Sequence, residues 1–141
     1  MNLYAESSAV LAWLLGEPAG ETVRRSLAAA ERIVASDLTL VECDRALVRA
    51  EKAGTIAEAA AADRRAHLAA AAAHWDLLRI EAEAVDRARR PFPEEPLRTL
   101  DALHLASALT ARGALPGLAL LSLDDRVRRS GRGLGFDLLP G

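Results

Sequence analysis

Short apolar runs alternate with longer amphipathic segments along the chain, and this alternation predicts its secondary structure. The short runs are rich in branched and aromatic residues and predict buried strands, namely Leu3–Ala5, Arg32–Ser36, Trp75–Ile80, Leu118–Leu121 and Phe136–Leu139. The longer segments carry apolar residues at helical spacing and predict helices, namely Ala9–Leu15, Pro18–Ala30, Leu38–Ala53, Thr55–Ala73, Glu81–Arg90, Arg98–Arg112 and Asp124–Arg132. Ser7 or Ser8 is a suitable N-cap for the first helix.

The order of these elements indicates the fold class. Strands alternate with helices throughout, and no Asn-Gly or similar hairpin signal joins two strands. Such alternation favours parallel strands connected by helices that cover both faces of the sheet. We therefore expect an α/β protein, a three-layer α/β/α sandwich with a central, mostly parallel sheet. With 141 residues, no internal repeat and no linker, residues 1–141 are expected to form a single domain.

Composition indicates the cellular compartment and limits the kinds of binding partner to expect. Hydrophobic residues make up 51% of the chain, enough for a core without disulfides, and the single Cys43 has no partner for an internal bridge. The chain has no basic-then-apolar leader and no apolar stretch of membrane-spanning length, so we expect a cytoplasmic protein without a membrane partner. A net charge of −2 argues against nucleic-acid binding over the whole surface but leaves room for a local basic patch.

Four acidic residues stand beside apolar stretches. Glu6 and Asp124 each follow a predicted strand, at the sheet edge where α/β proteins bind their ligands. Glu42 and Asp101 interrupt apolar helical stripes, in LTLVECDRAL and LRTLDALHLASAL, where an unpaired acid is unfavourable.

Each acid also has an ordinary structural interpretation. Glu6 can be a first-turn acid that the helix dipole favours, and Asp124 can be an N-cap. Asp101 can be a charge near a helix N-terminus that Thr99 caps. Glu42 can be a solvated residue paired with an arginine one turn along its helix.

If the four carboxylates lie together, they repel one another, and a cation is needed to keep them ionised. Oxygen ligands without cysteine or histidine suit Mg²⁺ or Mn²⁺ rather than zinc. Metal sites of this kind activate water and stabilise charge on a scissile phosphate. The residues alone therefore indicate a metal-dependent phosphodiesterase or nuclease.

Four sequence blocks resemble, in order and spacing, the motifs of PIN domains, and most closely those of VapC-type toxins of bacterial toxin–antitoxin pairs. The blocks are LYAESSAVLAWL, SDLTLVECDRAL, LRTLDALHLASAL and LLSLDDRVRRSGRGLGFDLLP, and they span nearly the whole chain. The resemblance implies a single PIN domain and an Mg²⁺-dependent endoribonuclease that cleaves RNA. It further implies that a cognate antitoxin inhibits the enzyme and that the protein is a homodimer.

The resemblance also implies roles for individual residues. It makes Glu6, Glu42, Asp101 and Asp124 the catalytic, metal-binding acids, with supporting hydroxyls at Ser7 and Ser122 that orient the site. The arginines beside these acids are either a solvated helix face or contacts for RNA phosphates, and they are Arg98, Arg126, Arg128 and Arg129. His104, three residues after Asp101, is either a metal ligand or general base, or a histidine that hydrogen-bonds locally.

The chain departs from the family pattern at its first acid, where the family usually has aspartate and this sequence has Glu6. The extra methylene moves the carboxylate outward by roughly 1.5 Å. Two alternatives to the ribonuclease remain, of which the first follows from this departure. One is a PIN-like RNA-binding or regulatory domain with weakened metal binding, and the other is a structure-specific DNA nuclease.

Overall fold

A computed structural model describes all residues from 1 to 141. Its five strands are β1 (Asn2–Ala5), β2 (Arg32–Ser36), β3 (Asp76–Leu78), β4 (Ala119–Leu121) and β5 (Leu138–Leu139). Its seven helices are α1 (Ser7–Leu14), α2 (Gly20–Ala29), α3 (Asp37–Lys52), α4 (Glu58–Ala72), α5 (Ala82–Ala88), α6 (Thr99–Ala114) and α7 (Asp125–Gly133). Every predicted strand and helix is present.

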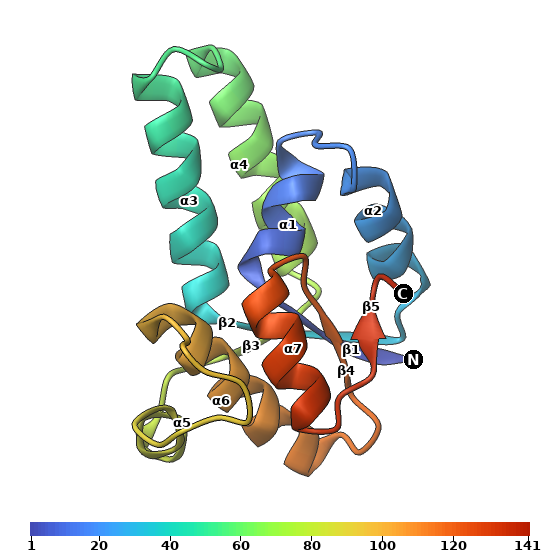
Figure 1. Ribbon diagram of the computed structural model, residues 1–141. Coiled ribbons are helices and arrows are strands. Elements are labelled where there is room, and N and C mark those ends of the chain that lie inside the picture. Colours follow the sequence, from blue (N-terminus) through green and yellow to red (C-terminus); the bar gives the residue numbers. More distant parts are fainter.

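The strands form one sheet in the order β3-β2-β1-β4-β5, and every neighbouring pair is parallel. From β1 to β3 the chain moves toward one edge of the sheet, and the β3-to-β4 connection crosses back over to the other side of β1. Right-handed crossovers place connections that run in opposite directions on opposite faces. Accordingly, α1–α4 cover one face and α5–α7 cover the other (Figure 1).

The core divides between the two faces because side chains alternate along a strand. In β1, Leu3 and Ala5 pack into the apolar layer beneath α1, whereas Tyr4 packs into the layer beneath α6. All three side chains are fully buried, as expected for the central strand of a sheet that is covered on both faces. The predicted three-layer α/β/α sandwich is confirmed, and its sheet is wholly rather than mostly parallel.

Several predicted boundaries are wrong. The third and fifth strands are shorter than predicted, since only Asp76–Leu78 and Leu138–Leu139 pair, at the two edges of the sheet. Glu6 rather than a serine caps α1, and Arg98 rather than Thr99 holds the N-cap position of α6. None of the helices combines the length and the apolar composition that crossing a membrane requires.

The close approach of α1 and α2 depends on Gly20 and generates a prediction. A Cβ at this position would lie 2.5 Å from the carbonyl oxygen of Ala12, which is backbone and cannot rotate away. We expect Gly20→Ala to lower the free energy of unfolding by about 1–3 kcal/mol in urea denaturation. Gly113→Ala is the matched control, because a Cβ there meets nothing within 4 Å and alanine favours the helix. Equal stability of the two variants would contradict the packing of α1 against α2.

Candidate active site

The candidate site lies at the carboxyl ends of β1 and β4, the two strands between which the order of the sheet reverses. Ligands of open α/β sheets bind at such a switch point. Glu6 follows β1 directly, and its backbone N–H donates to the carbonyl of Leu121, the last residue of β4. The pairing of these two strands therefore brings Glu6 next to the segment that carries Ser122 and Asp124.

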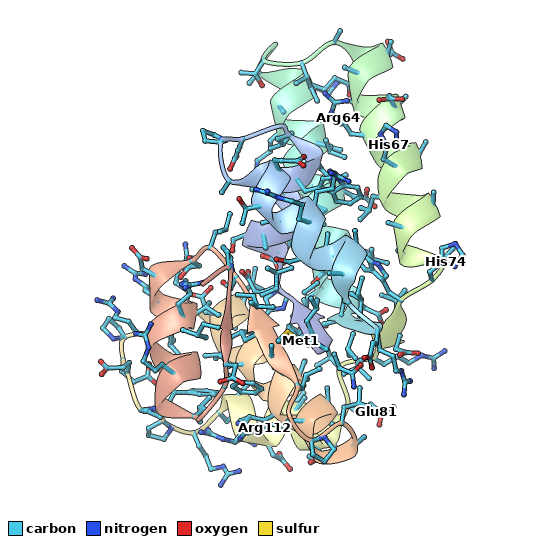
Figure 2. The ribbon with its side chains drawn as sticks, turned by 90° about the vertical axis from the view of Figure 1, so that its right-hand side faces the viewer. Met1, Arg64, His67, His74, Glu81 and Arg112 are labelled. Atoms are coloured by element: carbon cyan, nitrogen blue, oxygen red, sulfur yellow. The ribbon has the colours of Figure 1, made fainter.

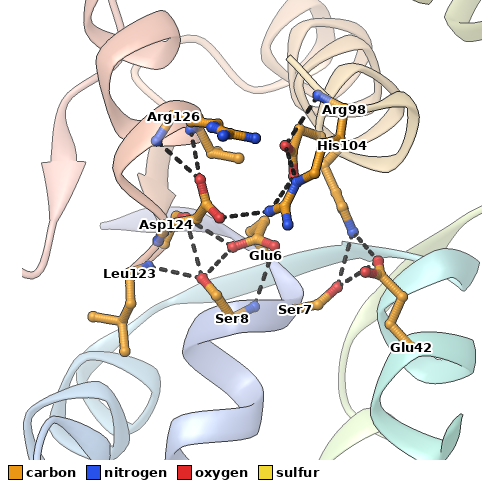
Figure 3. Close-up of polar contacts among 12 residues, drawn as sticks. Glu6, Ser7, Ser8, Glu42, Arg98, His104, Leu123, Asp124 and Arg126 are labelled. Atoms are coloured by element: carbon orange, nitrogen blue, oxygen red, sulfur yellow. Dashed lines mark hydrogen bonds and ion pairs between the residues drawn. The ribbon is translucent and has the colours of Figure 1, made fainter. Parts of the chain in front are cut away.

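Glu6 is almost fully buried, and two serines hold its carboxylate (Figure 3). Ser122 Oγ donates to Glu6 Oε2 over 2.7 Å, and Ser8 donates to the same carboxylate through both its hydroxyl and its backbone N–H. The Ser8 hydroxyl in turn accepts from the backbone N–H of Leu123. Because donors surround the carboxylate on the protein side, Glu6 has a fixed orientation at the end of β1.

Arg98 bridges two of the other acids. Its Nε lies 3.0 Å from Asp101 Oδ2, and a terminal nitrogen of the same guanidinium lies 2.8 Å from Asp124 Oδ2. Asp101 is buried in the first turn of α6, whereas Asp124 is partly exposed and caps α7 through its other oxygen. The guanidinium thus neutralises two carboxylates from different elements, with hydrogen bonds to Asp101 as the main cause of the raised pKa of Arg98.

Glu42 makes a separate network with a buried histidine. His104 Nε2 lies 2.5 Å from Glu42 Oε1 and 2.8 Å from Ser7 Oγ, while His104 Nδ1 lies 2.9 Å from the Tyr4 hydroxyl. An ionised Glu42 can only accept, so the proton lies on Nε2, and Nδ1 accepts from Tyr4. His104 therefore hydrogen-bonds within the protein and holds the Glu42 side chain against α6.

This network sets the charge state of its members. Partial burial alone would raise the pKa of Glu42, but hydrogen bonds from His104 and Ser7 outweigh it and lower the pKa below the ordinary value of 4.5. Burial raises the pKa of the Tyr4 hydroxyl, which stays protonated and available as a donor. Cys43, beside Glu42, is buried with its pKa raised to about 12, which makes it an unreactive core thiol.

The arginines of α7 fall into two groups. Arg128 donates from its guanidinium to the carbonyls of Ser122, Leu139 and Pro140, so it ties the end of β4 to the C-terminal strand. Arg126 and Arg129 are exposed, and their side chains make no hydrogen bond or ion pair within the chain. Arg132, in the last turn of α7, is likewise exposed and unpaired, so three of the four α7 arginines keep their charge free for an external anion.

The two other histidines lie far from these acids. His67 is on α4 and His74 follows the end of that helix, and both are exposed (Figure 2). They are surface residues, as their place in an alanine-rich segment predicts. His104 is thus the only histidine that contacts one of the four acids.

The acids at the carboxyl ends of the strands have the chemistry of a site for a hard divalent cation. Glu6, Asp101 and Asp124 present carboxylate oxygens and no sulfur, which is the set that Mg²⁺ or Mn²⁺ prefers. In this conformation no three acidic, histidine or cysteine side chains converge closely enough to bind one ion. The Arg98 guanidinium instead supplies the positive charge between Asp101 and Asp124.

Comparison with known proteins identifies the family of the chain. The family model described as "PIN domain" matches residues 3–132. The chain belongs to the PIN-domain family. This PIN domain is also 36% identical, over 137 residues, to ribonuclease VapC46 of Mycobacterium tuberculosis, an alignment that covers 97% of this chain and 95% of that protein.

Solved structures show the same fold. One is the toxin VapC20 of M. tuberculosis, described as cleaving the sarcin–ricin loop, with a TM-score of 0.65 and 18% identity over 95% of each chain. Another is VapBC2 of Rickettsia felis bound to a DNA fragment from its promoter, with a TM-score of 0.68 and 11% identity over 98% of this chain and 97% of that one. The PIN domain therefore shares its three-layer architecture with VapC toxins.

Sequence reasoning missed four contacts of the PIN domain's site. Ser8, rather than Ser7, holds Glu6, while Ser7 holds Glu42. Arg98 also contacts Asp124, 26 positions away, and no sequence pattern indicates this second contact. The alternation of side chains along β1 could have indicated the contact of Tyr4 with His104. It places Tyr4 on the α6 face of the sheet, opposite its neighbours Leu3 and Ala5.

The Glu42–His104 contact predicts a pH-dependent contribution to stability. The folded-state pKa of Glu42 lies below 4.5, so its ionised form stabilises the fold above that pH. Without added metal, we expect wild type to exceed Glu42→Gln by about 1 kcal/mol near neutral pH. The difference should vanish as the pH falls through the folded-state pKa of Glu42.

Urea unfolding at neutral and acidic pH measures this difference. Asp44→Asn is the control, because Asp44 is exposed on the same helix and makes no side-chain contact. A gap between wild type and Glu42→Gln that stays constant with pH would contradict the hydrogen bonds to an ionised Glu42.

Proposed function

We propose that this PIN domain is an Mg²⁺- or Mn²⁺-dependent endoribonuclease and the toxin of a type II toxin–antitoxin pair. The observation that carries the proposal is the position of Glu6, Asp101 and Asp124 at the switch point of the sheet, at the starts of three different helices, with Arg98 joining the two aspartates. The relationship to VapC46, which is named a ribonuclease and matches nearly end to end, supports the same activity. We also propose that residues 1–141 act as one catalytic domain.

Glu6, Asp101 and Asp124 are the proposed ligands of the cation, with Glu42 as the fourth acid of the site. A divalent ion held by such carboxylates activates water and offsets charge that develops on the scissile phosphate. Arg98 now neutralises Asp101 and Asp124, so binding of a divalent cation at these two carboxylates would require the guanidinium to turn away from them. Displaced from the aspartates, the Arg98 side chain is placed to contact the RNA backbone.

The remaining residues orient the acids and bind substrate. Ser8 and Ser122 fix the Glu6 carboxylate, which compensates for its longer side chain by locking its direction. Ser7 and His104 keep Glu42 ionised and fix its direction, which suits it as the fourth metal-binding acid. Arg126 and Arg129, with free charges beside Asp124, are the α7 arginines we propose as phosphate contacts.

The proposed partners follow from the same assignment. RNA is the substrate, and a cognate antitoxin protein is the expected inhibitor, because a solved structure with the same fold is a toxin–antitoxin complex from Klebsiella pneumoniae. We further expect a homodimer that acts in the cytoplasm, where its RNA substrates are.

Substituting the acids tests the ribonuclease. Asp101→Asn and Asp124→Asn each remove one ligand charge, and we expect each to lower Mg²⁺-dependent cleavage of total RNA by about 100-fold or more. Asp125→Asn is the matched control, because Asp125 is adjacent, exposed and makes no side-chain contact. Undiminished cleavage by both aspartate variants would sink the proposal, and cleavage of flap DNA in place of RNA would favour a DNA nuclease.

Glu6 distinguishes the enzyme from the regulatory alternative, an RNA-binding PIN domain with weak metal affinity. Because two serines orient Glu6, we expect calorimetry to detect binding of Mn²⁺ to wild type, with an affinity for Glu6→Asp within about tenfold of it. Ser122→Ala should weaken binding by releasing the carboxylate. If only Glu6→Asp binds the ion, the regulatory alternative is correct.

A further inference from the structure

A hollow of about 670 Å³ opens on the α5–α6 side of the sheet, next to the acids. It lies between α5, the loop of residues 89–97 and the first turns of α6. Its floor and walls are largely apolar and include Ile80, Val85, Ala88, Leu97 and Leu103. Val85 is 41% exposed, unusually high for a large apolar residue, so part of this wall faces solvent. The volume lies within the range of small-ligand sites.

The rim of the hollow is positively charged. Arg89, Arg90 and Arg98 line it together with one acid, Glu95. Both Glu95 oxygens already accept backbone N–H groups of the loop, at Phe92 and Leu97. Arg89 and Arg90 are exposed, and their guanidinium groups make no hydrogen bond or ion pair within the chain. In a protein with a net charge of −2, this local excess of unpaired arginine favours an anionic ligand.

The loop that carries the rim is held in place. The Arg87 guanidinium stacks on the ring of buried Phe92, 4.1 Å from its centroid, and donates to the carbonyls of Arg90 and Pro91. Together with the Glu95 contacts, these interactions fix the loop against α5. A preformed rim loses little conformational entropy when it binds a ligand.

The hollow is continuous with the candidate active site through Arg98. This residue lines the hollow and also donates to Asp101 and Asp124. A strand of nucleic acid whose backbone crosses the acids would therefore reach the hollow with an adjacent nucleotide. Such a nucleotide combines an apolar, flat base with an anionic phosphate, which matches the apolar walls and the arginine rim.

We propose that this hollow is a subsite for one nucleotide of single-stranded RNA next to the cleaved bond. The base packs against the Val85 and Leu103 walls, and the flanking phosphate lies at Arg89 and Arg90. The proposal rests on the ribonuclease function proposed above. A base can enter only after it leaves its stack, so the subsite selects single-stranded over paired RNA.

Fluorescence anisotropy tests the subsite with the full chain in EDTA, which prevents cleavage. The probe is a short fluorescein-labelled single-stranded RNA of mixed sequence, compared with a duplex of equal length. We expect Arg89→Ser/Arg90→Ser to weaken single-strand binding by about tenfold. The control is Arg24→Ser/Arg25→Ser, an exposed adjacent pair on α2 across the sheet in which Arg24 pairs with Glu21, and its effect should stay within about twofold. Wild type should bind the duplex more weakly than the single strand.

Other outcomes overturn the proposal in distinguishable ways. Equal losses in the two double variants mean general charge attraction, and equal affinity for duplex and single strand means that no base enters the hollow. If the Arg89/Arg90 variant binds RNA normally but sediments as a smaller species, the hollow is an interface between copies of the chain. If wild type cleaves RNA with Mg²⁺ and the Arg89/Arg90 variant binds RNA as well as wild type does, the subsite is refuted but the ribonuclease is not. A wild type that neither binds nor cleaves RNA refutes both the subsite and the ribonuclease.

Discussion

The carboxylates near the carboxyl ends of the strands repel one another, and the other residues of the site offset this repulsion. Every acid there is matched by a fixed donor or cation: the serine hydroxyls at Glu6, Arg98 at Asp101 and Asp124, and His104 at Glu42. Buried or half-buried carboxylates without such partners would take up protons and lose their use as ligands. The partners keep Glu42 ionised, and at the other three acids they place hydrogen-bond donors or a positive charge against the carboxylate oxygens.

The parallel sheet makes this gathering possible. Placing β1 beside β4 aligns two carboxyl ends whose following residues are separated by more than a hundred positions in the chain, as in the bond from Ser122 to Glu6. The α6 helix then crosses the same end on the opposite face from α1 and brings Asp101 and His104 against it. The arrangement depends on the strand order more than on any single side chain, which is why a chain only 18% identical can share the fold.

Much of this was predictable from local pattern. Period-two and helical spacings located all twelve elements, and the position of Glu6 and Asp124 after strands identified them as residues of the sheet edge. What local pattern could not predict is the choice of partners. Glu42 has arginines at helical spacing on α3, yet it pairs with His104, 62 positions away, because packing of α6 brings that histidine to it. Arg98 likewise has a local partner in Asp101, and its second partner Asp124 depends on the docking of α7.

The central claim is that Arg98 occupies, between Asp101 and Asp124, the position of the cation that the site is built to bind. Anomalous diffraction from crystals of the protein soaked in Mn²⁺ tests it most directly. The account predicts one anomalous peak in contact with Glu6, Asp101 and Asp124, with the Arg98 guanidinium turned away from the aspartates. Absence of a peak at saturating Mn²⁺, with Arg98 still bridging Asp101 and Asp124, would contradict it.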